Sequence, residues 1–106
     1  MTVVVRCAAA LALLMPAASL ARADTIHVEV KGLKYTPAQI SAHVGDTIEW
    51  ANEDFVAHTA TAKDGGWDVN LPPHKSGKTT LSKAGTVEYY CRFHPNMKGE
   101  ITVTAP

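Results

Sequence analysis

One short segment near the C-terminus carries three side chains that can bind a transition metal. Cys91, His94 and Met97 follow one another at intervals of three residues in the sequence CRFHPNM. Thiolate and thioether sulfurs are soft donors and imidazole binds copper, so one more histidine would complete the donor set of a blue-copper site. His58, in a segment of small and β-branched residues, can supply that histidine. We therefore expect His58, Cys91, His94 and Met97 to form one metal site.

The methionine favours copper over zinc. Zinc binds cysteine and histidine, but a thioether is not among its usual ligands. Cu(I) prefers soft sulfur and Cu(II) prefers nitrogen, so a rigid mixed set suits both states and little has to move when an electron arrives. We expect one copper ion that cycles between Cu(I) and Cu(II), with Cys91 forming the most covalent bond and Met97 adjusting the potential.

The N-terminus has the pattern of a secretory signal peptide. Arg6 precedes a short apolar run, and a small-residue cleavage motif ends at Ala23. The run is too short for a membrane helix, which needs about 20 apolar residues. We expect cleavage before Asp24, which gives a signal peptide (1–23) and one domain (24–106) in a mature protein that is soluble and periplasmic.

The charge composition argues against proteins that bind nucleic acid or anionic membranes. Lys and Arg together number 10, Asp and Glu also number 10, and there is no basic cluster in the expected mature chain. This composition argues against nucleic acid or an anionic membrane as a partner, and we expect a monomer.

Loss of Cys7 would leave Cys91 without a disulfide partner in an oxidising compartment. Metal binding would explain the presence of a single unpaired cysteine.

The hydrophobic pattern of the expected domain has the period of a β-strand. Apolar and polar residues alternate in 26–30, 40–44 and 48–50, and Gly and Pro turn signals separate these runs. About seven or eight short strands predict an all-β fold, a single Greek-key β-sandwich, with antiparallel pairing. His27 and His43 fall on the polar phase and should be solvated.

The same alternation places the cysteine. Val87 and Tyr89 share one face of a predicted strand, and Cys91 is the next residue on that face. Ile101 and Val103 repeat the pattern after the loop. The ligand loop should therefore join two core strands and hold a shielded sulfur at one end of the sandwich.

These residues resemble the cupredoxin, or type 1 blue copper, family. The resemblance rests on His58 and the Cys91-x2-His94-x2-Met97 spacing, and it extends from about Thr25 onward. The short loop, with a proline directly after His94, is most similar to that of the amicyanins. In the family an asparagine before the first histidine joins the two ligand loops by hydrogen bonds, which implies this role for Asn52.

The resemblance also implies a function and partners. It implies a periplasmic electron carrier, not an enzyme, that takes electrons from a dehydrogenase-type donor and passes them to a cytochrome-type acceptor. An amine dehydrogenase and a c-type cytochrome are the implied pair. One difference is Arg92, which stands where the family often has Thr or Ser beside the asparagine.

Other classes of function remain open at this point. A periplasmic copper storage or delivery protein would use the same ligands. A thiol enzyme could use Cys91 as nucleophile and His94 as base, but would leave Met97 without a role. A copper oxidase or reductase needs a second, open metal site, and an adhesive β-sandwich would bind no metal.

Overall fold

The computed structural model describes residues 22–106, so nearly all of the predicted signal peptide lies outside the described residues. This part of the chain consists of strands and turns, and no helix in it is long and apolar enough to cross a membrane. The strands are β1 (Thr25–Val30), β2 (Tyr35–Thr36), β3 (Gln39–His43), β4 (Thr47–Asn52), β5 (His58–Ala62), β6 (Asp68–Leu71), β7 (Ser76–Thr80), β8 (Gly85–Tyr90) and β9 (Lys98–Thr104).

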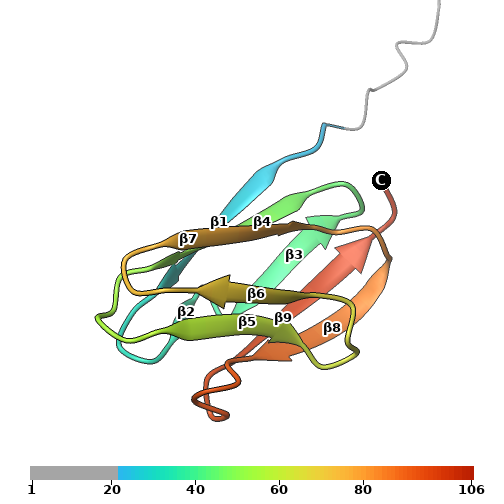
Figure 1. Ribbon diagram of the computed structural model, residues 1–106. Coiled ribbons are helices and arrows are strands. Elements are labelled where there is room, and N and C mark those ends of the chain that lie inside the picture. Colours follow the sequence, from blue (N-terminus) through green and yellow to red (C-terminus); the bar gives the residue numbers. More distant parts are fainter. Residues whose placement is uncertain (1–21) are drawn as a thin grey trace, which may run out of the picture.

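The strands form two sheets that pack face to face (Figure 1). One sheet has the order β2-β1-β4-β7 and the other β3-β9-β8-β5-β6. The predicted all-β sandwich is therefore confirmed. Two pairings differ from the expected antiparallel arrangement, because β1 pairs with β4 and β3 with β9 in parallel. Alternation of apolar residues shows which face of a strand is buried but not which strand becomes its neighbour, so the sequence did not reveal these crossovers.

Burial follows the period-2 pattern of the sequence. Val28 and Val30 on β1 are buried, as are Ile101 and Val103 on β9. Residues of the opposite phase face solvent, including His27 and His43, whose side chains are 73% and 65% exposed. Removing apolar side chains from water is the main favourable contribution to folding, so these inward rows fix the register of the strands.

A cluster of aromatic rings fills the space between the sheets. Tyr89 packs against Tyr35, Trp50 and Trp67, with ring centroids 4.7, 5.5 and 5.6 Å apart. Burial raises the pKa of Tyr89 to about 12, so its hydroxyl stays protonated and accepts a hydrogen bond from Trp50 Nε1 at 3.3 Å. Through Tyr89 the cluster packs against the inner face of β8, the strand that leads into the ligand loop.

Three loops meet at one end of the sandwich, at the lower left of Figure 1. These are the β4–β5, β6–β7 and β8–β9 loops. Strand register brings the first two together, since His58 at the start of β5 lies opposite Leu71 at the end of β6. The β8–β9 pairing ends at Tyr90 and Lys98, which leaves residues 91–97 as the loop at this end.

We predict that Gly99→Ala destabilises the fold, because a methyl group at this position would overlap the phenol ring of Tyr89. Overpacking of this kind costs about 1 to 3 kcal/mol. The matched control is Gly66→Ala, whose new methyl group would meet only the flexible side chain of Asp64. Urea denaturation measures both, and equal unfolding free energies for the two variants would contradict the packing described here.

Candidate metal centre

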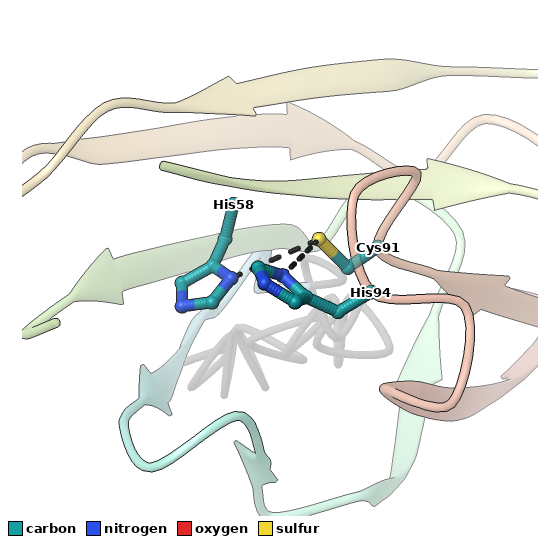
Figure 2. Close-up of side chains that lie close together, drawn as sticks. All are labelled: His58, Cys91 and His94. Carbon is teal, nitrogen blue, oxygen red and sulfur yellow. Dashed lines mark hydrogen bonds between the residues drawn. The ribbon is translucent and has the colours of Figure 1, made fainter. Parts of the chain in front are cut away.

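The structure brings together side chains from two distant segments. His58 is the first residue of β5, and Cys91 and His94 lie on the loop that follows β8. Figure 2 shows both imidazole rings turned toward the sulfur of Cys91. The donor atoms of these three residues all lie within 4.8 Å of one another.

The separations between the donor atoms match those around a single metal ion. Nδ1 of His58 lies 3.8 Å from Sγ of Cys91, and Nδ1 of His94 lies 3.6 Å from it. At zinc, a bound sulfur lies at about 2.3 Å and a bound nitrogen at about 2.0 to 2.1 Å. If the angle between these two bonds is tetrahedral to trigonal, the sulfur and the nitrogen lie roughly 3.6 to 3.8 Å apart. Each imidazole nitrogen therefore lies at the distance from the sulfur that a shared ion requires.

The site is shielded on one side and reaches the surface on the other. Cys91 and His58 are buried, with 0% and 1% of their surface exposed, and Met97 is buried at 3%. His94 is half-buried. Met97 lies in the core cluster together with Cys91, on the same loop as two of the donors. Solvent can thus approach the site from the side of His94.

Hydrogen bonds within the backbone close the ligand loop into a compact turn. Cys91 N donates to Met97 O at 3.1 Å, His94 N to Cys91 O at 3.2 Å, and Met97 N to His94 O at 2.8 Å. All three residues expected to bind metal on this loop are therefore fixed to one another.

Thr59 joins the two segments that carry the donors. Its backbone N–H points at Sγ of Cys91 from 3.4 Å, and its hydroxyl accepts a hydrogen bond from Arg92 N at 2.9 Å. Its carbonyl accepts a hydrogen bond from the hydroxyl of Tyr35, a side chain of the aromatic cluster. Thr59 thus connects the strand that carries His58 to the loop that carries Cys91.

Asn52 makes a different connection from the one expected. Its side-chain amide donates to the carbonyls of Val56, Leu71 and Pro72 at 2.9, 2.9 and 3.2 Å. It therefore joins the β4–β5 loop to the β6–β7 loop, and its hydrogen bonds within the described residues do not reach the Cys91 loop. That connection is made by Thr59, which directly follows His58.

Asp54 contacts His58 and was not identified from the sequence. Its Oδ2 lies 2.8 Å from His58 Nε2, while Oδ1 accepts a hydrogen bond from Gly32 N at 2.9 Å. The Gly32 N–H and then the His58 ring lower the pKa of this carboxyl below its ordinary value. The sequence offered only the four-residue spacing from Asp54 to His58 as a signal of this contact. An Asp that follows Asn and Glu is also typical of an ordinary turn.

The side chain of Arg92 fastens the ligand loop to the edge strand β6. Its guanidinium lies 3.2 Å from Asp68 Oδ1 and donates to Asn70 Oδ1 at 3.2 Å. The Thr61 hydroxyl and the Arg92 charge both lower the pKa of Asp68. Arg92 thus supplies from its side chain an anchor that a Thr or Ser at this position could not provide.

Comparisons with known proteins agree with this geometry. The sequence matches the family of cupredoxin-like domains over residues 3–103. It is 28% identical over 87 residues to amicyanin of Paracoccus versutus, covering 76% of this chain and 66% of that protein. It is 30% identical over 84 residues to amicyanin of Paracoccus denitrificans, covering 74% and 64%. The chain thus spans just under two thirds of the length of these two relatives.

Two further matches extend the comparison. The methylamine utilization protein MauL of Methylorubrum extorquens is 30% identical over 89 residues, covering 80% of this chain and 78% of that one. Among solved structures, an oxidized amicyanin variant superposes with a TM-score of 0.66 at 27% identity, covering 74% of this chain and 80% of that one.

We predict that Thr59→Ala loosens the ligand loop, because it leaves the Arg92 amide without its acceptor. Loss of one such hydrogen bond costs about 1 kcal/mol. Thr59→Ser keeps the hydroxyl and is the matched control. Amide hydrogen exchange at Arg92 should be about fivefold faster in the alanine variant and unchanged in the serine variant. Equal protection in all three proteins would show that the hydroxyl does not hold the loop.

Proposed function

The chain belongs to the cupredoxin-like family, and from this membership we propose that it is a small periplasmic electron carrier that uses one type 1 copper ion. His58, Cys91, His94 and Met97 are the proposed ligands. The observation that carries the proposal is the placement of one sulfur and two imidazole nitrogens, from segments far apart in sequence, at separations suited to a single ion.

The chemistry of the donor set supports copper. Two histidines, one thiolate and one thioether would suit both Cu(I) and Cu(II), so a bound copper ion would supply one-electron transfer. The protein's part is to hold these donors still. Backbone hydrogen bonds fix Cys91, His94 and Met97 within one turn, and strand β5 fixes His58.

His94 is the proposed point of entry and exit for electrons. It is half-buried, whereas His58 and Cys91 are buried, so its ring gives the shortest path from the donor set to the surface. Exposed apolar side chains lie on the loops at this end, with Phe55 87% and Phe93 55% exposed. Exposed apolar surface of this kind marks docking sites, and redox partners bind through small, transient interfaces.

The partners and the compartment are inferred from the relatives. Similarity to amicyanins and to a protein of methylamine utilization supports an amine dehydrogenase as the electron donor. A c-type cytochrome is the proposed acceptor, and the protein needs no catalytic activity of its own. We propose that residues 1–23 direct export of a mature domain, 24–106, to the periplasm, where these proteins would meet.

The test is to add Cu(II) to the metal-free protein and record visible and EPR spectra. We expect one copper per chain, an intense blue absorption band and narrow copper hyperfine splitting, because a thiolate bond to Cu(II) is strongly covalent. Cys91→Ser and His94→Ala should each remove the blue band. His43→Ala is the matched control, since this histidine is exposed on β3 far from the donor set.

Three outcomes would contradict the proposal. A colourless one-to-one complex would indicate a different kind of metal site, and retention of the band in Cys91→Ser would exclude the sulfur as a ligand. Rapid loss of copper to a mild chelator would instead favour storage or delivery of copper.

A further inference from the structure

We propose that Asp54 is a positioning residue that fixes the tautomer and the orientation of His58. Its role toward copper rests on the proposed function, but its effect on the histidine does not require a metal. The carboxylate sits beside a ring that is already enclosed, since the side chain of His58 is 0% exposed and that of Asp54 is 18% exposed.

The contact determines which ring nitrogen carries the proton. A neutral imidazole has one donor nitrogen and one acceptor nitrogen, whereas an ionised carboxylate only accepts. Asp54 Oδ2 lies 2.8 Å from Nε2 of His58, so Nε2 carries the proton and donates. Nδ1 is then left with its lone pair, and this is the nitrogen that faces Cys91 Sγ from 3.8 Å. The carboxylate thus selects the tautomer that can bind a metal between the two residues.

The carboxylate is itself held by the turn between β1 and β2, two strands of the sheet that also contains β4. The backbone N–H groups of Gly32 and Leu33 donate to its two oxygens at 2.9 and 3.4 Å. Both residues have positive φ angles, 61° and 60°, and consecutive amides in such a conformation form a concavity that binds anions. The chain from Lys31 to Lys34 closes this turn with two backbone hydrogen bonds. The β1–β2 turn therefore determines the direction in which Asp54 faces.

Asp54 is also held through its backbone by Asn52, the residue at the end of β4. Asp54 N donates to Asn52 Oδ1 at 2.9 Å, and the amide of Asn52 holds three carbonyls of neighbouring loops. Asp54 is consequently anchored both at its carboxylate and at its backbone N–H. The combination of these anchors with the contact to a buried ring is why we assign a role to Asp54.

The contact has a consequence for the bound metal. A carboxylate behind a metal-binding histidine orients the ring and raises its basicity, and loss of such partners typically costs 10- to 100-fold in affinity. A more basic nitrogen favours Cu(II) over Cu(I), because Cu(II) prefers nitrogen donors. Asp54 should therefore lower the reduction potential of the site.

The first test uses the metal-free protein. Long-range proton–nitrogen NMR at pH 8 should show His58 with its proton on Nε2 in the unaltered chain. In Asp54→Ala we expect a mixture of both tautomers, while Asp54→Glu should restore the Nε2–H form. Asp64→Ala is the matched control, because Asp64 also accepts a backbone amide in a turn, that of Gly66, but lies away from the donor set. An unchanged Nε2–H tautomer in Asp54→Ala would overturn the proposal.

The second test measures the potential of the copper-loaded protein. In Asp54→Ala the ratio of Cu(II) to Cu(I) affinity should fall about tenfold, which raises a one-electron potential by about 59 mV. Asp64→Ala should leave the potential unchanged, and a potential that does not rise in Asp54→Ala would contradict the assigned role.

If Asp54→Ala fails to fold, Asp54→Asn replaces it. Asn has the same shape as Asp without the charge, and this variant should shift the potential in the same direction. If copper gives no blue site at all, the proposed function fails, and the NMR result still decides the role of Asp54.

Discussion

The site depends on keeping one cysteine sulfur buried and unpaired beside two imidazole rings. Cys91 has no exposed surface, and a buried thiolate is costly unless a cation or hydrogen-bond donors compensate its charge. The Thr59 amide supplies one donor, and the two ring nitrogens leave room for a metal cation to supply the rest. Strand alternation makes this burial unavoidable, because Cys91 continues the inward row that includes the buried Tyr89. The fold thus places the sulfur beside two imidazole nitrogens that could bind the same metal ion.

The contacts that fix the donors are separate from the donor atoms themselves. Backbone hydrogen bonds close residues 91–97 into a turn, and Thr59 ties that turn to the strand that carries His58. Asp54 contacts the far nitrogen of His58 and leaves the near one free. These contacts orient the His58 ring and fix the backbone of the ligand loop, and together they form a cage around the site. A rigid cage changes little between oxidation states, which is what rapid electron transfer requires.

The sequence predicted the parts of the site that depend on local spacing. Three donors within seven residues indicated the loop, and the alternation of Val87, Tyr89 and Cys91 indicated that the sulfur is buried. The contacts made across the fold were not predicted. Asn52 was expected to reach the Cys91 loop, but its side-chain amide donates to the carbonyls of Leu71 and Pro72. Such contacts depend on which loops become neighbours, and a strand pattern does not contain that information.

The most direct measurement of the central claim is X-ray absorption at the copper edge in both oxidation states. Convergence of Cys91, His58 and His94 on one ion predicts one sulfur at about 2.3 Å or less and two nitrogens at about 2.0 to 2.1 Å, close to the distances of the same ligands at zinc. The same set should appear after reduction with little change in length. A spectrum without a short sulfur scatterer, or one in which the nitrogen count falls on reduction, would contradict a preformed cage.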